Sequence, residues 1–412
     1  MNIQEEIHAA YPDLIALRRW FHTHPELSEK EFHTMDYIEA RLKEYGIPFV
    51  RVPRGGILAE IDSGRPGFHV LLRADIDALP IQEAKQNLGH DRVCISENPG
   101  CMHACGHDGH MAMQLTAGRI LNAHKDEWDG KVYLMFEEGE ENESGCVLNL
   151  FHYIDDHQIH IDTCYATHVR WNIPAGKVTI LSGPAMAGLF RFQVEIHGEG
   201  AHGSRPDLAE SPIDCYASCY EALQGIRMND ISPEATLTFS IGYVHAGIVE
   251  NVIPDTLSFG GTVRFFQEDQ GQLFSRRFSE VMDAACALHG CSWKFIRSIL
   301  LYPVENNPIC AKIAIDAVKK NLGADTLYDG GRWMASESFA RCLAKWPGIL
   351  AFTGIEDPDI GSGANHHTAQ FDIGEKGLIN GVGTALSYTL AMLKQKPQIP
   401  FTAREKRQDF EK

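Results

Sequence analysis

Side chains that can bind metal ions are concentrated in four short segments of the chain. These segments are 101–110, 137–141, 167–168 and 365–367. Cysteine, histidine and carboxylate are the ligands that zinc and similar ions take, and a mixed set is typical of a catalytic site. Three of the segments follow or border apolar runs typical of strands. Because ligands of α/β domains bind where loops leave the carboxyl ends of strands, we expect the four segments to converge.

The spacing of Cys105 and His107 indicates that the first segment would bind metal from a loop. Residues two apart do not share a helix face, so both can reach one metal centre only from a loop. We expect that loop to precede a helix over 111–123. The amino terminus of this helix would favour the thiolate form of Cys105.

Each segment alone has a simpler interpretation. Cys101 and Cys105 could be half of a structural zinc site, but we find no second Cys/His pair at zinc-finger spacing. The pair also lacks the Cys-x-x-Cys spacing of thiol redox proteins. Glu140 and Glu141 alone would indicate a solvated loop, and single histidines are more often plain loop or core residues. Only the combination predicts a catalytic metal site.

The composition excludes several classes of protein. The chain has 412 residues, of which 44% are hydrophobic and 22% charged, as in ordinary globular proteins with two domains. A net charge of −18 without basic runs disfavours nucleic acid and anionic membranes as partners. The acidic amino terminus without a long apolar stretch, together with eleven scattered cysteines, predicts a cytoplasmic location.

Helical and strand-like patterns alternate outside the region 189–299. Capping boxes at 28–31 and 372–375 predict helices over 29–45 and 375–393. A further helix is expected over 309–321. The short apolar runs expected to form strands are 56–62, 69–73, 131–136 and 163–169. This alternation predicts an α/β catalytic domain with helices packed on a mostly parallel sheet.

Residues 189–299 have a different pattern. Apolar and polar residues alternate over 189–197, which predicts a strand with one face in solvent. The elements expected after it are a helix from Ser211-Pro212, strands near 235–243 and 256–265, a helix over 269–288 and a strand near 291–298. The order βαββαβ is that of a ferredoxin-like α+β unit. We therefore predict a catalytic domain of 1–185 and 300–412, with an inserted lid or dimerisation domain of 186–299.

Four motifs resemble the amidohydrolase branch of the aminoacylase and carboxypeptidase metallohydrolases, which includes hippurate hydrolases and indole-acetyl-amino acid hydrolases. In chain order they are 72–80 (LRADIDALP), 102–110 (MHACGHDGH), 251–254 (NVIP) and 261–264 (GTVR). The resemblance extends from about the first predicted helix to Glu375. It implies a dinuclear metal-dependent hydrolase of linear amide bonds.

The resemblance also implies roles for single residues. Glu140 would be the general base, and His202 of the lid would stabilise the oxyanion in a partner subunit's active site. Asn251 and Arg264 would contact the substrate, although a cross-strand ion pair explains Arg264 equally well. Asp75 would steady the site. The implied ligands of the two metal ions are Cys105, His107, Glu141, His168 and His367.

Several features depart from the family pattern or need a separate decision. Relatives usually carry Phe-Gln-Pro-Ala-Glu-Glu where this chain has Phe-Glu-Glu-Gly-Glu-Glu, so Glu137 and Glu138 add negative charge beside the base. His367 is preferred to His366 because the family's ligand lies four residues before the Phe of a Phe-Asp pair. Segment 82–100 is long for a loop, and we expect it to contribute to the pocket wall.

The predicted reaction is hydrolysis of the amide bond of an N-acyl amino acid or a related small amide. A hydroxide bridging two divalent ions, zinc or manganese, would attack the carbonyl. One alternative is dipeptidase or carboxypeptidase activity on small peptides. Another is a metal-binding protein that has lost turnover. The expected partner is the small-molecule substrate, and the expected assembly is a homodimer or a dimer of dimers.

Overall fold

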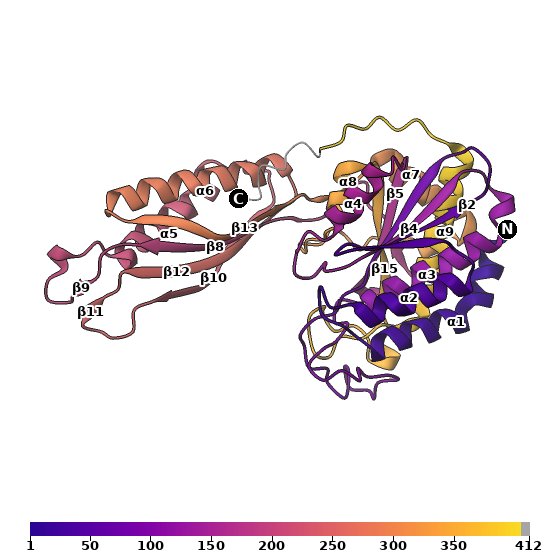
Figure 1. Ribbon diagram of the computed structural model, residues 1–412, viewed down its shortest axis with the longest axis horizontal. Helices are drawn as coiled ribbons and strands as arrows, with labels where there is room; N and C mark the ends of the chain where they lie inside the picture. Colours follow the sequence, from indigo (N-terminus) through magenta and orange to yellow (C-terminus); the bar gives the residue numbers. More distant parts are fainter. Residues whose placement is uncertain (405–412) are drawn as a thin grey trace. The chain divides into compact units, whose positions relative to one another are not determined.

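A computed structural model of the protein describes residues 1–404, which form two compact units (Figure 1). Unit 1 comprises Met1–Gly183, Glu305–Gly331 and Cys342–Ala403. Unit 2 comprises Pro184–Val304, Arg332–Arg341 and Arg404. Arg332–Arg341 therefore packs in unit 2, whereas the sequence placed it with 300–412. No helix in the described part of the chain is both long and apolar enough to cross a membrane.

A seven-stranded sheet in the order β1-β2-β4-β3-β5-β15-β6 forms the centre of unit 1. Its inner strands are mutually parallel: β4 (Lys131–Glu137), β3 (His69–Asp75), β5 (Thr163–Pro174) and β15 (Gly348–Glu356). The outer strands are antiparallel to their neighbours: β1 (Phe49–Val52), β2 (Gly56–Asp62) and β6 (Val178–Thr179). The inner strands are buried along most of their length, which explains their continuous apolar runs. Strand β15 was not predicted from the sequence.

Helices cover both faces of this sheet. One face carries α1 (Ile3–Thr23), α2 (Phe32–Glu44), α3 (His107–Ala123), α7 (Pro308–Asn321) and α9 (Leu378–Gln395), which share one apolar core. The other face carries α4 (Val147–Asp156), which packs on β1 and β2. Neither α1 nor α4 was predicted. Their burial on the two sheet faces completes the α/β layering that the sequence predicted.

Both predicted capping boxes of unit 1 are wrong. Helix α2 begins at Phe32, and Ser28 instead donates a hydrogen bond to Asp77 at 2.7 Å. Helix α9 begins at Leu378, and Asp372 instead accepts a hydrogen bond from Arg18 at 3.1 Å. In both cases the side chain that matched a helix signal makes a polar contact with a residue distant in sequence. A tertiary partner thus replaced the local capping interaction.

A four-stranded antiparallel sheet in the order β10-β12-β8-β13 forms unit 2. Its elements along the chain are β8 (Gly188–His197), α5 (Pro212–Asn229), β10 (Leu237–Ala246), β12 (Thr256–Phe265), α6 (Glu268–Leu288) and β13 (Ser292–Leu301). This order confirms the ferredoxin-like prediction. Ser211 caps α5 as expected, with its Oγ accepting a hydrogen bond from the Asp214 amide. The remaining short elements are β7 (Gly183–Met186), β9 (Ala201–His202), β11 (Val252–Ile253), β14 (Val304–Asn306) and α8 (Ala340–Lys345).

Candidate dinuclear metal centre

The residues singled out by their chemistry in unit 1 lie together at the carboxyl end of its parallel strands. Asp75 and Glu137 end strands β3 and β4 in register. Cys105 precedes α3, and His107 is its first residue, so this helix begins four residues earlier than predicted. Strand β5 carries His168, and His367 follows β15. The topology therefore brings residues more than 250 positions apart in sequence, such as Cys105 and His367, to one place.

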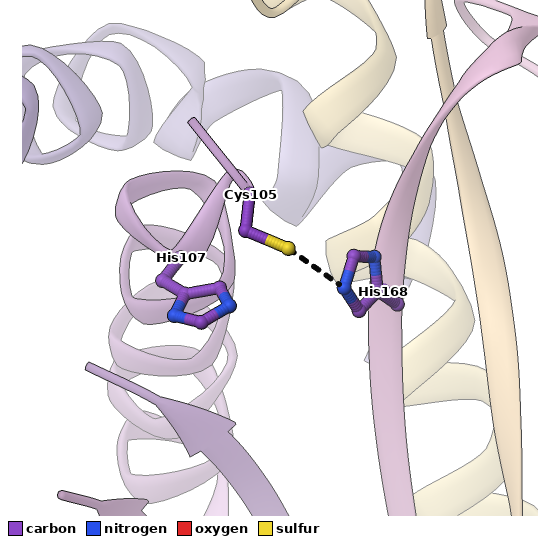
Figure 2. A group of neighbouring side chains, drawn as sticks. All are labelled: Cys105, His107 and His168. Atoms are coloured by element: carbon purple, nitrogen blue, oxygen red, sulfur yellow. Dashed lines mark hydrogen bonds between the residues drawn. The ribbon is translucent and has the colours of Figure 1, made fainter. Parts of the chain in front are cut away.

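The candidate ligand atoms form two sets that share Cys105. One set joins Cys105 with His107 and His168, and the other joins it with Glu141 and His367. The Cys105 Sγ lies 3.5 Å from the His168 Nε2 and 3.4 Å from the His367 Nε2. Figure 2 shows this thiol directed at the His168 ring, with His107 beside it at the start of its helix. A shared thiolate between two sets of ligands is an arrangement that can hold two ions.

Two atoms of these sets are buried and lack a hydrogen-bond partner among the described residues. They are His107 Nε2 and Glu141 Oε1, which lie 3.7 Å apart. Leaving such atoms unsatisfied is costly unless another group satisfies them. The His107 Nδ1 donates to the Asp77 carbonyl at 2.9 Å, which directs the lone pair of Nε2 into the cluster. The donor set and its orphaned atoms therefore fit a pair of divalent ions.

The backbone conformation at two positions supports this convergence. Gly106 has φ +94°, and a Cβ atom there would lie 2.2 Å from the Val169 Cγ2. Only glycine therefore fits between Cys105 and His107. His367 has φ +60°, which is uncommon for a residue other than glycine. Strained backbone of this kind clusters at functional sites, where the surrounding structure holds it in place.

The Cys105 thiol does not behave as the sequence predicted. Burial, followed by the negative charge of Glu141, raises the pKa of Cys105 well above its ordinary value. Both effects oppose the thiolate form that the helix amino terminus was expected to favour. A divalent cation between the ligands would offset both effects and favour the thiolate form.

Asp75 lies beneath the cluster as a buried carboxylate. Its Oδ1 accepts a hydrogen bond from His110 at 2.6 Å, and its Oδ2 accepts one from Arg73 at 2.8 Å. Although burial opposes its charge, His107, His110 and Arg73 hold the pKa of Asp75 well below its usual range. The His110 Nε2 also accepts a hydrogen bond from the Val169 amide at 2.9 Å. No role for His110 was predicted from the sequence. Its place three residues after His107 could have indicated it, because residues i and i+3 share a helix face.

The carboxylates after strand β4 have different environments. Glu140 lies with His107 and Glu141 in a third group of candidate ligand atoms. Glu137 is buried and accepts a hydrogen bond from Arg73 at 2.6 Å, which neutralises its charge. Glu138 lines a separate pocket of about 310 Å³ together with Glu29 and Arg54. Of the two extra carboxylates of this chain, Glu137 is therefore paired with Arg73, and Glu138 lines a separate pocket.

A buried network of charges, which the sequence analysis did not predict, supports the loop that begins α3. Arg18 is fully buried, and its Nε donates to Asp108 at 2.9 Å. The same guanidinium reaches Asp372, which follows His367 by five residues. His22 joins Asp108 to Glu83 at 2.8 and 2.9 Å. One network thus connects α1 with segments on both sides of the cluster.

The network also accounts for much of the long segment 82–100. Glu83, Asn87 and Arg92 of this segment all take part in it. Arg92 lies 3.1 Å from Glu83, and Asn87 donates to Asp372 at 2.9 Å. Arg92 also donates to the carbonyl groups of Phe371 and Ala369. The segment is therefore held by buried polar contacts, while its contribution to a pocket wall stays a prediction.

Unit 2 carries the predicted lid residues on two paired segments, with His202 opposite Val252 and Asn251 directly before that residue. Strand β9 pairs with β11, and the Gly203 amide donates to the Asn251 carbonyl at 2.8 Å. The His202 side chain is exposed, and its Nδ1 accepts from the Ser204 amide at 3.1 Å. Its Nε2–H can therefore donate to a ligand. Arg264 donates to Ser336 at 2.6 Å, and the residues opposite it in the sheet, Thr238 and Leu189, are uncharged.

A family model described as peptidase family M20/M25/M40 matches residues 71–390. The chain belongs to this family. The match includes the segments that carry all the candidate ligands, and it confirms the predicted resemblance. M20 members are dinuclear metal-binding hydrolases in at least one solved case, a Bacillus subtilis protein described as a dinuclear metal binding peptidase. That structure aligns with a TM-score of 0.78 and 28% identity over 94% of this chain and 99% of its own.

Characterised relatives differ in substrate. The N-acetyl-L-cysteine deacetylase of Bacillus subtilis is 34% identical over 89% of this chain and 85% of its own. Thermostable carboxypeptidase 2 of Saccharolobus solfataricus is 31% identical over 92% of this chain and 95% of its own. An IAA-amino acid hydrolase of Arabidopsis thaliana is 31% identical over 93% of this chain and 86% of its own. The names of these relatives describe hydrolysis of amide bonds in small molecules or peptides.

Proposed function

We propose that this M20 protein hydrolyses the amide bond between an acyl group and an amino acid, using two divalent metal ions per chain. The observation that carries the proposal is the convergence of two ligand sets on Cys105, with Glu140 beside them. The ligands in this proposal are Cys105, His107, Glu141, His168 and His367. Thiolate, imidazole and carboxylate together suit zinc, and manganese is a second candidate.

Glu140 is the general base of the proposed reaction. When bound, the two ions polarise the scissile carbonyl and acidify water. The Glu140 carboxylate takes a proton from the attacking water and then donates it to the nitrogen of the leaving amine. Its position with Glu141 and His107 places it next to the ions that those residues would hold.

Other residues of the chain hold this arrangement in place. Asp75 orients His110 and lies 3.5 Å from the His107 Nε2. Asp77 accepts the Nδ1 proton of His107 and the amide proton of Glu141, so a single carboxylate positions one proposed ligand of each set. Fixing the ligands in this way reduces the reorganisation that metal binding and turnover require.

His202, Asn251 and Arg264 are the proposed contacts to substrate from unit 2. His202 lies opposite Val252, the residue after Asn251, so both residues belong to one two-stranded segment of unit 2. His202 would donate to the oxyanion in the active site of a partner subunit, which requires at least a homodimer. Arg264 would pair with the substrate carboxylate. We also place the protein in the cytoplasm, in agreement with its eleven free cysteines.

Carboxypeptidase activity is the second candidate function. It is favoured by the 31% identity to thermostable carboxypeptidase 2 over most of both chains. The two functions share the metal ligands and the base, and they differ in whether the acyl half of the substrate carries a free amine.

The decisive test is release of free amino acid from a substrate panel. The panel contains N-acetyl, N-benzoyl and N-arylacetyl amino acids and simple dipeptides, and the protein is stripped of metal and resupplied with zinc or manganese. We expect metal-dependent cleavage of at least one N-acyl amino acid, and no cleavage by the Glu140→Gln variant. Cleavage of dipeptides alone would favour the carboxypeptidase function. A metal-loaded protein that cleaves no member of the panel would contradict both.

A further inference from the structure

Four cysteines of unit 2 form a cluster that the proposed hydrolysis does not use. Cys215 and Cys219 lie one turn apart on α5, Cys286 lies near the end of α6, and Cys291 directly precedes β13. The Cys215 Sγ is 3.5 Å from the Cys286 Sγ and 3.9 Å from the Cys219 Sγ. These three thiols form one group of candidate ligand atoms, and Cys291 lies beside Cys215 at its edge, with its Sγ also directed at the Glu210 and His289 carbonyls. Three of the eleven cysteines of the chain therefore meet at one point, and a fourth lies beside them.

The sulfur separations identify what the cluster could hold. A disulfide requires a sulfur–sulfur distance of ~2.05 Å, much shorter than either separation. In a tetrahedral zinc site with Zn–S bonds of ~2.3 Å, neighbouring sulfurs are ~3.8 Å apart. The observed 3.5 and 3.9 Å both lie close to that value. The thiols are thus spaced as they would be around one ion.

The chain segments supply these thiols in a way suited to metal binding. Residues i and i+4 share a helix face, so Cys215 and Cys219 point to the same side of α5. After α6 the chain turns at Gly290, with φ +71°, and the Cys291 amide donates to the Cys286 carbonyl at 2.9 Å. This turn returns the fourth thiol to the cluster. The spacings Cys-x3-Cys and Cys-x4-Cys differ from zinc-finger spacing, which explains why the sequence analysis did not identify them.

Burial distinguishes this cluster from a set of reactive surface thiols. Cys215 and Cys219 are fully buried, Cys286 is 3% exposed, and Cys291 is half-buried. The Cys291 side therefore gives an ion a route from solvent. Buried cysteines elsewhere contact other atoms: Cys310 pairs with the Thr163 hydroxyl, and Cys164 with the Trp346 carbonyl. Simple apolar packing of thiols does not require three sulfurs to share one position.

We propose that Cys215, Cys219, Cys286 and Cys291 bind one thiophilic divalent cation of the zinc class. The thiols release protons to solvent as the ion binds. The ion joins the first turns of α5 to the end of α6 and the start of β13, so its role is to stabilise unit 2. This ion would be separate from the two ions of the proposed hydrolysis and would share no ligand with them.

Cobalt(II) is the probe that tests it, because cobalt–thiolate bonds give strong charge-transfer absorption. The full-length Cys105→Ala variant is stripped of metal and titrated with cobalt, since removing Cys105 leaves the unit 2 cluster as the proposed source of thiolate ligands. We expect this absorption to saturate at one cobalt per chain and to be lost when Cys215→Ser and Cys286→Ser are added. Adding Cys310→Ser instead, at a buried thiol of unit 1, should leave the signal unchanged.

A second measurement keeps the test informative where the double substitution fails to fold. Cys291→Ser, at the half-buried position, should weaken zinc binding at least tenfold and abolish the rise in melting temperature that zinc produces in the Cys105→Ala protein. Absence of cobalt–thiolate absorption in folded Cys105→Ala protein would overturn the proposal and assign the cysteines to core packing. A shortfall of two thiols in denatured, unreduced protein would overturn it in favour of a disulfide.

Discussion

Strand β5 of unit 1 and strand β8 of unit 2 place their polar residues in opposite environments. His168 and Arg170 of β5 are buried, and His168 hydrogen-bonds to the Val169 carbonyl and faces the Cys105 thiol. On β8 the polar residues alternate with buried ones, and Glu195 pairs with Lys294 at 3.0 Å on the half-exposed face. Buried polar groups must be satisfied by specific partners, whereas exposed pairs contribute little. Polar residues of the buried sheet therefore point to function more strongly.

Removing Cys105 should have the largest effect, because both ligand sets depend on it. Cys105→Ala is expected to lose the two metal ions of the unit 1 site and to lower kcat/KM by at least ~10³-fold. Elemental analysis and turnover of the same preparation test this. Cys310→Ala, at a buried thiol of the same unit, should retain metal and most activity. Full metal content in Cys105→Ala would remove Cys105 from the proposed ligands.

Breaking a buried ion network should cost far more than breaking an exposed pair. Arg18→Met removes the buried guanidinium that Asp108 and Asp372 share, although His22 and Arg92 still face them, and we expect a loss of about 3 kcal/mol in unfolding free energy. Arg205→Met breaks an exposed pair with Asp207 in unit 2 and should leave the unfolding free energy almost unchanged. Denaturant unfolding of both variants measures the difference. Equal losses would show that burial does not set the strength of these contacts.

His202 tests whether the exposed tip of unit 2 takes part in catalysis. His202→Ala should lower kcat by ~10²–10³-fold while metal content and stability stay unchanged. His197→Ala, at a half-exposed histidine that pairs with Glu195, is the matched control and should be almost fully active. Mixing His202→Ala with Glu140→Gln should restore some activity, because hybrid dimers contain one intact site. No recovery despite subunit exchange would argue against a shared site.

Glu31 should give unit 1 a pH dependence of stability. Burial, followed by the charge of Asp77, raises the pKa of Glu31 from 4.5 to about 9. The folded state therefore binds a proton that the unfolded state has lost, and stability falls as pH rises between these values, by at most ~1.4 kcal/mol per pH unit. In metal-free protein, Glu31→Gln should lack this contribution, while exposed Glu44→Gln should retain it. The measurement is the unfolding free energy of wild type and Glu31→Gln from pH 5 to pH 9. If the two proteins change in parallel over this range, the raised pKa of Glu31 is contradicted.

Elements with a strong local pattern could be predicted from the sequence. The alternation in β8 and the Ser211-Pro212 start of α5 were correct because nearby residues determine both. The capping boxes predicted at Ser28 and Asp372 were wrong because these side chains form hydrogen bonds with residues distant in sequence. The five candidate ligands were identified through motifs, but their sharing of Cys105 depends on strand order. The Arg18 network and the thiol cluster of unit 2 arise only from packing between distant segments.

The most direct test of the central claim is the metal content and turnover of Glu140→Gln, measured on one preparation with the best substrate of the panel. If Glu140 transfers the proton and the neighbouring residues hold the ions, the variant will keep the metal content of the wild-type protein and lose kcat by ~10²–10⁴-fold. A Glu140→Gln protein with full activity, or one that loses its metal together with its activity, would contradict the assignment of Glu140 as the base.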